Sequence, residues 1–330
     1  MFKFGILGCG MIANIHALAI KGIENVQLVG VADNKKEFAD NFAQKHGVKA
    51  FASFEEMLAD KEIDVVCICT PSCFHAPNAI QAMQSGKHVV LEKPMAFTAA
   101  EADQVIEVSK KTGKLLTVIS QLRFSPDILK LKELVQKGAF GKITLCTLSM
   151  KYYRSEEYYS SSPWKGTKKF DGGGALMNQG IHGIDLLQYI VGAVKSVQGQ
   201  VRTLSHAIEV EDTAAAVLEF ECGALGTVQG SSCSYPGFER KIEIHGDKGY
   251  ALLVENKIEK MMIDGEQVQV EFTQGEVNTA SDPTALDCGA HRKQMMNLLG
   301  AIEGKEKLLI DGNEGKKAVE IIEKIYKTSK

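Results

Sequence analysis

The sequence predicts an α/β protein of two domains, a doubly wound parallel sheet followed by an α+β domain with a large, mostly antiparallel open sheet. The first 120 residues alternate strand-like and helical patterns at a short period, as in parallel sheets covered by helices. Their apolar runs are continuous in Val, Ile and Leu, which indicates strands buried on both faces. Beyond residue 123, long segments alternate apolar and polar residues, which is typical of antiparallel strands with one exposed face.

Five strands and five helices are expected in the first domain. The strands cover residues 3–8, 26–33, 63–70, 88–93 and 115–120, and the helices cover residues 12–21, 35–46, 54–58, 77–84 and 99–111. Such alternation implies right-handed crossovers between parallel strands. We expect the first domain to comprise residues 1–121 and the second to comprise residues 122–330.

The second domain is expected to begin with a helix at 125–137 and a strand at 144–153, followed by a helix at 181–190. Alternating segments with turn signals then predict its sheet. They cover residues 194–205, 213–221, 224–234, 240–246, 250–256, 257–263 and 266–272. Two helices, at 286–302 and 314–327, are expected after the sheet. No low-complexity linker separates the two halves, so we expect the domains to pack together.

Composition describes an ordinary globular protein. The chain has 330 residues, 45% hydrophobic and 24% charged, with a formal net charge of −3. This balance argues against nucleic acid or an anionic membrane as the main partner. The N-terminal residues MFKFGILGCGMI lack the features of a signal peptide, and no apolar run approaches the roughly 20 residues that span a bilayer. We therefore expect a cytosolic protein.

The cysteine pattern favours a buried core over a disulfide scaffold or a metal site. Eight cysteines are scattered along the chain, and three of them, Cys67, Cys69 and Cys73, lie close together. Two of these three stand inside the apolar run IDVVCICT, and no CxxC pair is present. Thiols in such a setting pack as small hydrophobic groups, so no metal is expected.

The stretch GILGCGMIANIH predicts a dinucleotide site. Gly8 and Gly10, with Ala13 where a third glycine often stands, follow a predicted strand and open a predicted helix. Dinucleotide binding needs this context, because Gly8 permits the tight turn and Gly10 lets a pyrophosphate approach the backbone. Met11 and Ile12 begin the helix, whose N-terminal amides and dipole favour an anion. The alternative is a plain strand–helix turn.

The end of the second predicted strand favours NAD over NADP. Asp33 lies about 20 residues past Ala13, at the spacing expected of the acidic residue that binds the ribose hydroxyls. Its carboxylate would repel a 2′-phosphate. Lys35 and Lys36 stand close by and can shield a phosphate, so NADP remains an alternative.

Three stretches together resemble one family. These are GILGCGMIA, the run TPSCFHAPNAIQAMQSGKHVVLEKPMAFT from residue 70 to 98, and GGGALMNQGIHGIDLL. They resemble the glucose–fructose oxidoreductase, inositol dehydrogenase and rhizopine catabolism (Gfo/Idh/MocA) family. The resemblance implies a Rossmann domain joined to an α/β domain with a large open sheet. It also implies NAD(P)-linked oxidation or reduction of a sugar or cyclitol hydroxyl, in homodimers or homotetramers built through the sheet.

The resemblance gives Lys93 a catalytic role. Lys93 precedes a proline, which favours an extended backbone, and it stands at a strand end, where α/β sheets bind ligands. Its ammonium can hydrogen-bond the substrate oxygen and the cofactor ribose and stabilise developing negative charge. The alternative is a solvated strand-end lysine. The residues that the resemblance places at the cofactor are Thr70, Pro71, His75, Glu92 and Gln121, the last beside the nicotinamide.

His182 is the candidate general base. The segment IHGIDLLQYI predicts a helix in which His182 and Asp185 are neighbours. If the helix begins early, Asn178 shares their face. A histidine with a shifted pKa is suited to taking a hydroxyl proton, while the cofactor carries the hydride chemistry. The alternative is a helix histidine satisfied by the backbone.

One position departs from the inositol dehydrogenases of the family. There the residue four before the histidine is an aspartate, whereas here it is Asn178. An amide does not stabilise an imidazolium as a carboxylate does, and it both donates and accepts hydrogen bonds. We expect Asn178 to position substrate and Asp185 to hold His182 or contact substrate. The MNQGIH form looks more like members that act on aldohexosides or nucleotide-linked amino sugars.

The segment KYYRSEEYYSSSPWKGTKKFD is a candidate sugar-binding wall. It holds Tyr153 and Trp164, whose rings can stack on a sugar, and Lys165, which can meet polar groups; Arg154 and Lys168 can do the same. An ordered subunit-interface loop is the alternative. Arg123 is expected to bind substrate or phosphate, or to form a domain-interface salt bridge.

Three functional classes follow from these residues. The first is an NAD(P)-dependent dehydrogenase of a sugar, sugar derivative or cyclitol. The second is an NAD-retaining glycosidase or epimerase of the same family, and the third is a non-catalytic dinucleotide-binding sensor. Lys93 and His182 argue against the sensor, and NADH absorbance during turnover separates the first two classes.

Overall fold

The computed structural model describes residues 1–268 and 288–330, and the chain divides into two compact units. One unit comprises Met1–Gln121 with Asp287–Lys316, and the other comprises Leu122–Leu286 with Lys317–Lys330. The expected boundary at residues 121 and 122 coincides with this division. The expectation that residues 122–330 form one uninterrupted second domain differs from it, because helix α10 (Gly289–Ile302) places Met295 and Leu298 in the core of the first unit.

The first unit contains a six-stranded, fully parallel sheet. Its strands are β1 (Phe2–Leu7), β2 (Val26–Ala32), β3 (Lys49–Ala50), β4 (Val65–Ile68), β5 (His88–Leu91) and β6 (Leu116–Val118). They lie in the order β3-β2-β1-β4-β5-β6, which is that of a Rossmann domain. The doubly wound sheet is thus confirmed. Strand β3 was not expected, since two residues are too few to show a pattern.

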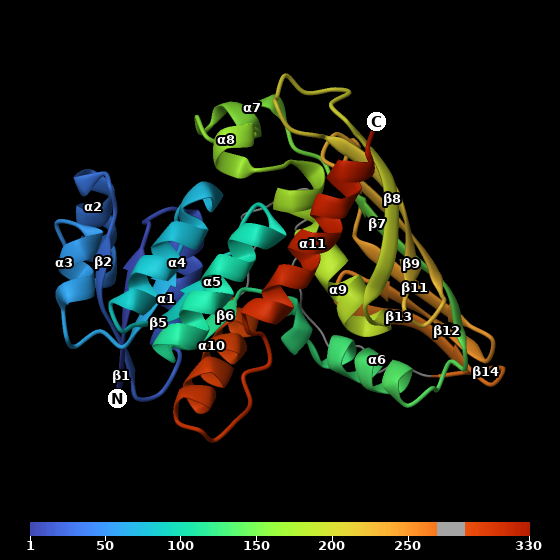
Figure 1. Cartoon of the computed structure of the whole chain (residues 1–330), viewed down its shortest axis with the longest axis horizontal. Helices are drawn as coiled ribbons and strands as arrows, with labels where there is room; N and C mark the ends of the chain where they lie inside the picture. Colours follow the sequence, from blue (N-terminus) through green and yellow to red (C-terminus); the bar gives the residue numbers. More distant parts are fainter. Residues whose placement is uncertain (269–287) are drawn as a thin grey trace. The chain divides into compact units, whose positions relative to one another are not determined.

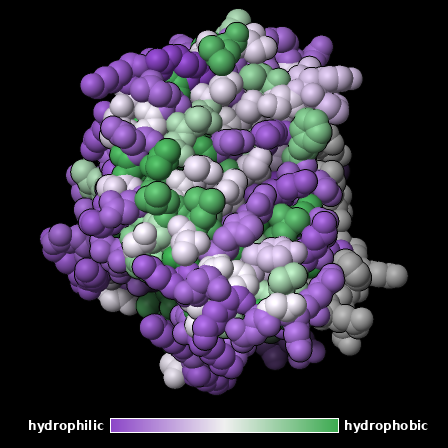
Figure 2. Space-filling model, turned by 90° about the vertical axis from the view of Figure 1, so that its right-hand side faces the viewer, coloured by the Kyte–Doolittle hydropathy of each residue, from purple (hydrophilic) through white to green (hydrophobic). Residues whose placement is uncertain are grey.

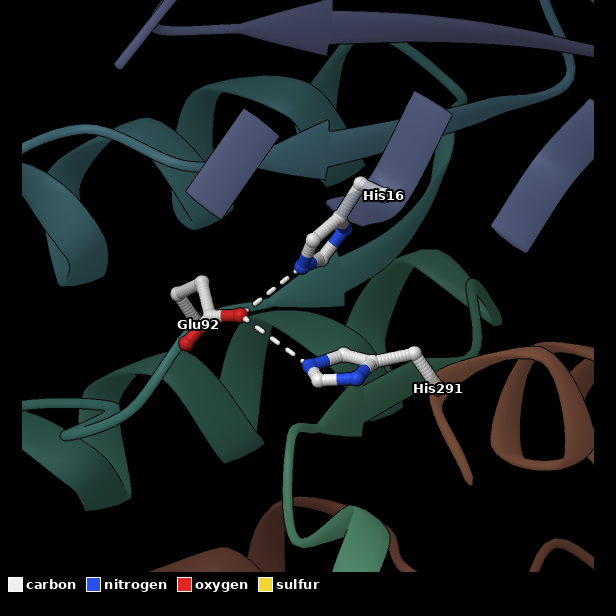
Figure 3. Close-up of side chains that lie close together, drawn as sticks. All are labelled: His16, Glu92 and His291. Carbon is white, nitrogen blue, oxygen red and sulfur yellow. Dashed lines mark hydrogen bonds and ion pairs between the residues drawn. The ribbon is translucent and has the colours of Figure 1, made fainter. Parts of the chain in front are cut away.

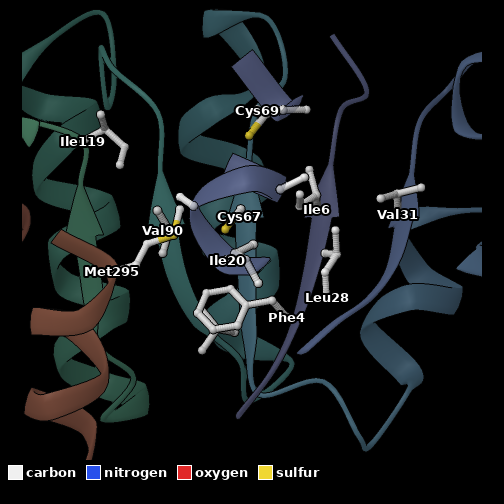
Figure 4. Packing of buried hydrophobic residues seen from close by; sticks show 14 of the residues in the cluster. Phe4, Ile6, Ile20, Leu28, Val31, Cys67, Cys69, Val90, Ile119 and Met295 are labelled. Carbon is white, nitrogen blue, oxygen red and sulfur yellow. The ribbon is translucent and has the colours of Figure 1, made fainter. Parts of the chain in front are cut away.

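Helices between the strands complete this unit. They are α1 (Met11–Lys21), α2 (Lys36–His46), α3 (Phe54–Ala59), the 3-10 turn Ser72–Phe74, α4 (His75–Gln84) and α5 (Ala99–Thr112). In the core, Phe4, Ile20 and Cys67 pack between sheet and helices, and Met295 joins them from α10 (Figure 4). Cys67 and Cys69 are both buried here, as the sequence predicts, and Cys73 is partly exposed.

The second unit contains an eight-stranded sheet (Figure 1). Its strands are β7 (Ile143–Lys151), β8 (Val194–Arg202), β9 (Thr213–Phe220), β10 (Leu225–Ser231), β11 (Lys241–Gly246), β12 (Gly249–Val254), β13 (Lys257–Ile263) and β14 (Glu266–Gln267). In the order β14-β13-β12-β11-β7-β10-β9-β8, β7 and β10 are parallel and the other pairs are antiparallel. The mostly antiparallel sheet is confirmed. The strand expected at 266–272 is seen as β14, and its residues 269–272 lie outside the described part of the chain.

The helices of the second unit include α6 (Pro126–Gln136), which follows the 3-10 turn Gln121–Phe124, and α9 (Ile181–Val191), both packed on the sheet. The short α7 (Glu156–Ser160) and α8 (Lys168–Asp171) lie between β7 and α9 in the chain, and α11 (Gly312–Thr328) is the last helix. Helix α9 is apolar almost all round and packs on α6, β7 and β11, so it is a buried helix. A π-helical turn, Ala175–Gly180, runs directly into it.

Two polar side chains at the C-terminal end of α11 contact the edge strand β8. The hydroxyl of Thr328 accepts a hydrogen bond from Gly199 N at 3.1 Å, and that of Ser329 accepts one from Val201 N at 3.0 Å. Exposed strand edges invite pairing with other chains. These two contacts occupy amides that would otherwise offer such an edge.

The other face of the sheet carries an exposed apolar group. Leu145 on β7 and Leu225 on β10 are register partners, and Val217 lies on the adjacent strand β9. About half of each side chain is exposed. Figure 2 shows the side of the molecule where these strands lie, with apolar residues gathered among hydrophilic ones. Within residues 1–268 and 288–330, no helix has the length and apolar character needed to cross a bilayer.

Candidate active site

The glycine loop after β1 fits the predicted dinucleotide site. Gly8 has φ +90°, and a Cβ there would lie 2.7 Å from the carbonyl oxygen of Cys69, so only glycine is accommodated. A Cβ at Gly10 would meet nothing within 4 Å. Gly10 is also the N-cap of α1 and offers no side chain to its first amides. The helix thus begins at Met11 and Ile12 with backbone amides suited to a phosphate.

Asp33 is fixed at the end of β2, next to this loop. Its Oδ2 accepts a hydrogen bond from Cys9 N at 2.8 Å, and its Oδ1 accepts one from Lys35 N at 2.9 Å. Each carboxylate oxygen retains a further lone pair. The carboxylate is partly exposed, as a ribose ligand needs to be.

Lys93 is the accessible residue of a buried segment. From residue 89 to 96, every side chain except that of Lys93 is buried. Glu92 is 4% exposed, and its Oε2 accepts a hydrogen bond from Lys93 N at 3.1 Å. The backbone following β5 therefore presents Lys93 alone, at the carboxyl end of a parallel sheet.

His75 supports the same loop from the other side. Its Nδ1 lies 2.6 Å from the carbonyl oxygen of Pro94, and its Nε2 lies 2.8 Å from that of Thr70. Burial lowers the pKa of His75, although both carbonyl contacts favour the charged form. Thr70 and Pro71 are partly exposed beside it. His75 thus joins two loops that the sequence assigns to the cofactor.

Gln121 has an unused hydrogen-bond acceptor. The residue is 7% exposed, and its Oε1 is buried without a partner. Buried polar atoms of this kind call for an explanation, and a carboxamide of a nicotinamide is a suitable donor. Gly8, Gly10, Asp33 and Gln121 therefore fit an NAD cofactor by their own geometry.

Glu211 anchors the three-glycine segment before the π-helical turn. Its carboxylate accepts hydrogen bonds from Gly174 N and Leu176 N, each at 2.9 Å, and from the Tyr326 hydroxyl at 2.8 Å. Burial raises the pKa of Glu211 against these hydrogen bonds. The sequence analysis missed Glu211 and Tyr326, since nothing in their local pattern marks them.

Each of the three glycines is required by a different structural constraint. Gly172 ends α8 with φ +73°, a conformation that glycine adopts without strain. A Cβ at Gly173 would overlap the Tyr326 hydroxyl, and one at Gly174 would overlap the carbonyl oxygen of Glu211. Gly173 and Gly174 therefore let the backbone approach the protein's own Tyr326 and Glu211 closely.

Asn178 lies in a polar network of the second unit. Its Nδ2 donates to Asp171 Oδ1 at 2.5 Å, and its Oδ1 accepts from Gln179 Nε2 at 3.3 Å. Gln179 in turn donates to the Tyr158 hydroxyl at 2.9 Å and accepts from Arg154 Nη2 at 2.9 Å. The network brings Asn178 together with the aromatic segment, as the sequence suggests. Tyr158 belongs to the predicted aromatic segment, whereas Asp171 and Gln179 were missed, although an aspartate directly before three glycines was a visible signal.

His182 is the accessible residue in the first two turns of α9. From residue 181 to 188, all residues except His182 are buried. Arg123 and Asp185, for which the sequence predicts substrate contacts, face one another: Arg123 Nε lies 2.8 Å from Asp185 Oδ2, and Nη2 lies 2.6 Å from Oδ1. Both side chains are at most 5% exposed. This bidentate pair lies within the second unit and holds α9, while its contact with substrate remains a prediction.

The aromatic segment is only partly assembled into one wall. Lys165 Nζ lies 4.0 Å from the centre of the Tyr158 ring, and burial lowers the pKa of Lys165. Tyr153 packs edge-on against Tyr235, with ring centres 5.1 Å apart. Trp164 is partly exposed, and Lys168 is exposed. Lys165 thus lies near the Asn178 network, whereas Tyr153 packs against a different loop.

Two buried histidines near Lys93 were also missed. His16 on α1 and His291 on α10 both face Glu92, and the ligand atoms of the three side chains lie within 4.8 Å of one another. Such a set can in principle hold a metal ion. His16 Nε2 and Glu92 Oε1 are 2.7 Å apart, however, which is a direct hydrogen bond. A histidine in the apolar stripe of α1 was the available signal.

Comparison with known proteins agrees with this geometry. Residues 2–120 match the model of an oxidoreductase family with an NAD-binding Rossmann fold, and residues 128–252 match the Gfo/Idh/MocA C-terminal domain. The chain belongs to the Gfo/Idh/MocA oxidoreductase family. The resemblance inferred from the three sequence stretches is thereby confirmed.

Relatives within the Gfo/Idh/MocA family include named dehydrogenases. Myo-inositol 2-dehydrogenase of Thermotoga maritima is 31% identical over 75% of this chain and 73% of that protein. D-glucoside 3-dehydrogenase of Escherichia coli is 26% identical over 99% of this chain and 95% of that one. The WlbA dehydrogenase of Bordetella pertussis, solved with NADH and UDP-GlcNAcA, is 30% identical with a TM-score of 0.88, covering 99% of this chain and 96% of that one.

We predict that Gly174→Ala destabilises the second unit by about 3 kcal/mol or more, because the new methyl group overlaps a backbone carbonyl that has little room to move. The matched control is Gly47→Ala, at the left-handed C-cap of α2, where a Cβ has open space. It should cost about 1 kcal/mol. Denaturant unfolding measures both changes, and equal costs would contradict the close approach at Gly174.

Proposed function

We propose that this protein is an NAD-dependent dehydrogenase that transfers hydride between the nicotinamide and a secondary hydroxyl or ketone of a sugar, sugar derivative or cyclitol. The observation that carries the proposal is shared by its two candidate catalytic residues. Lys93 and His182 are each the accessible side chain of an otherwise buried segment. Burial of the residues on either side of this lysine and this histidine supports a role for their side chains in contact with a ligand.

The chain's own residues divide the work of such a reaction. The amides at Met11 and Ile12 hold the pyrophosphate, Asp33 holds the ribose, and Gln121 Oε1 accepts from the carboxamide. When bound, NAD supplies the hydride acceptor. His182 takes the hydroxyl proton as general base. Lys93 stabilises the oxygen on which negative charge develops.

Sugar derivatives are the preferred substrates in this proposal. Asn178 Nδ2 and Oδ1 are held by Asp171 and Gln179, which fixes an amide where inositol dehydrogenases of the family carry an aspartate. Relatives that span nearly the whole chain include a glucoside dehydrogenase and a dehydrogenase solved with UDP-GlcNAcA, and also an inositol 2-dehydrogenase, so the choice among them rests on Asn178. We therefore place glycosides and nucleotide sugars ahead of free cyclitols, with Asn178 and Lys165 as the substrate contacts.

An NAD-retaining enzyme is the second candidate. It would use the same Lys93 and His182 without net reduction of the cofactor. A panel of glycosides, nucleotide sugars and cyclitols, followed by NADH absorbance and by product analysis, separates the two. Product without net NADH supports retention, and NADH formed in step with product supports the dehydrogenase.

Substitution of the two candidate catalytic residues tests the proposal. Lys93→Met and His182→Asn should each lower kcat by about 100-fold or more, as loss of an electrostatic or acid–base group does. NADH binding, followed by fluorescence, should be largely kept. The control Lys137→Met removes an exposed lysine of the second unit and should match the parent. A Lys93→Met protein with parental kcat would favour a sensor.

Asp33 should set the choice of cofactor. Asp33→Asn keeps the size and one acceptor but removes the negative charge that repels a 2′-phosphate. We expect kcat/KM for NADP to rise relative to NAD by about tenfold or more, which is about 1.4 kcal/mol. Asp40→Asn, an exposed position on α2, is the control and should leave the ratio unchanged. An unchanged ratio in Asp33→Asn would mean that the carboxylate does not select NAD.

We also propose that the protein is a cytosolic homodimer or homotetramer. Eight unpaired cysteines suit a reducing compartment. The exposed apolar group of Leu145, Val217 and Leu225 suits burial against a second copy of the same sheet. Leu225→Lys should shift the mass measured by light scattering toward one chain, whereas Leu129→Lys on α6 should not. An unchanged mass for Leu225→Lys would place the interface elsewhere.

A further inference from the structure

Two histidines and one glutamate form a buried cluster beside the Lys93 loop (Figure 3). His16 comes from α1, Glu92 follows β5, and His291 comes from α10; their exposed fractions are 0%, 4% and 1%. The Nε2 atoms of His16 and His291 lie 2.7 Å and 3.9 Å from the same oxygen, Glu92 Oε1. Three elements that are far apart in the sequence thus meet at one carboxylate.

The second oxygen of this carboxylate holds the backbone of Lys93. Glu92 Oε2 accepts from Lys93 N at 3.1 Å. On the far side of Lys93, the carbonyl oxygen of Pro94 lies 2.6 Å from His75 Nδ1. The main chain around Lys93 is therefore fixed by buried side chains in both directions, while its own side chain remains partly exposed.

Glu92 is negatively charged in the folded protein. Burial would raise the pKa of Glu92, but the hydrogen bond from His16 and the nearby positive charge outweigh burial and hold it below its usual range. His16 Nδ1 is buried without a hydrogen-bond partner, so a proton there would be a buried unsatisfied donor. The Nε2–H of His16 therefore donates to Glu92 Oε1. The negative charge of Glu92 acts on the groups around it, which include Lys93.

A purely structural role explains this cluster poorly. Replacing a buried ionic group with apolar residues is often neutral or stabilising, and the surrounding core of the first unit is apolar. The position of the cluster also points to a role beyond stability. It connects α1, whose first turn is the candidate phosphate site, to the backbone amide of Lys93.

We propose that His16, Glu92 and His291 are positioning residues for Lys93. In this role Glu92 fixes the Lys93 backbone relative to α1 and supplies the buried negative charge that keeps the Lys93 ammonium charged during hydride transfer. The catalytic part of this role rests on the proposed function, whereas the hydrogen-bonded cluster itself does not.

The other titratable groups that face Glu92 are few. They are His75 from α4 and the thiols of Cys67 on β4 and Cys69 directly after it. Burial raises the pKa of both thiols far above its ordinary value, so they stay neutral at working pH.

The test compares Glu92→Gln with Lys87→Met, at the two ends of β5. Glu92→Gln keeps the shape and removes the charge. On the substrate that the parent turns over, we expect kcat to fall about 10- to 100-fold, the KM for NAD to change less than about threefold, and the alkaline limb of the kcat profile to move to lower pH. Lys87 donates to two backbone carbonyls, of Asp60 and Ile63, so Lys87→Met should lose stability and keep the parental kcat and pH profile.

A second pair of variants, His16→Gln and His16→Leu, keeps the proposal testable if Glu92→Gln does not fold. His16→Gln retains a donor of similar reach and should restore much of the kcat that His16→Leu loses. Nitrogen-15 NMR of the histidine rings gives a readout without turnover. It should show an Nε2–H tautomer for His16 in the parent and a shifted resonance in Glu92→Gln.

These outcomes separate the two proposals. A parent that turns over no sugar but shows the Nε2–H signature would remove the proposed function and leave the cluster standing. Parental kcat and pH profile in folded Glu92→Gln would overturn the positioning role. One equivalent of metal in the purified parent, lost in His16→Leu, would also overturn it and make the cluster a metal site.

Discussion

The hydrogen bonds that buried carboxylates accept from main-chain amides are the interaction on which the candidate site residues of each unit depend. In the first unit Glu92 accepts from the amide of Lys93, and in the second Glu211 accepts from Gly174 and Leu176. Neither carboxylate is exposed to solvent to any extent that would let it bind substrate. Each instead fixes backbone: Glu92 fixes that of Lys93, and Glu211 fixes that of the segment just before Asn178. Precise placement of a reacting group needs such support, because a displacement of about 1 Å can cost two orders of magnitude in rate.

Burial raises the pKa of both carboxylates, but the net pKa shift has the opposite sign in the two. For Glu92, the hydrogen bond from His16 and the neighbouring positive charge outweigh burial, and its pKa falls. For Glu211, burial outweighs three hydrogen bonds, and its pKa rises. Glu211 is therefore the weaker acid, and its partner Tyr326 has a raised pKa as well. The same residue type serves as a permanent charge in one unit and as a hydrogen-bond hub in the other.

Local pattern was sufficient to predict most of the fold. The parallel strands, the antiparallel sheet and the helix at α9 all follow from hydrophobic periodicity, which is a property of neighbouring residues. Long-range packing was not predictable in this way. Helix α10 looks like any amphipathic helix, and only the structure shows that Met295 joins the core around Phe4.

The candidate site residues show the same difference between local pattern and long-range packing. Glycine spacing predicted the loop at Gly8 and Gly10, and Asp33 was found from its distance along the chain. By contrast, Arg123 and Asp185 are 62 residues apart and pair with one another, and the Glu92 cluster draws on three separate elements. A polar residue at a buried position signals that a partner exists, but its spacing does not identify the partner.

The contribution of α10 also constrains how the chain folds during synthesis. The core of the first unit includes Met295, Leu298 and Leu299, and its charged cluster includes His291. A ribosome therefore has to deliver nearly 300 residues before this core can close, although domains generally fold in the order of their synthesis. Until then the parallel sheet has an incompletely covered apolar face. The unit that carries Lys93 is begun first and is completed only after most of the other unit has been made.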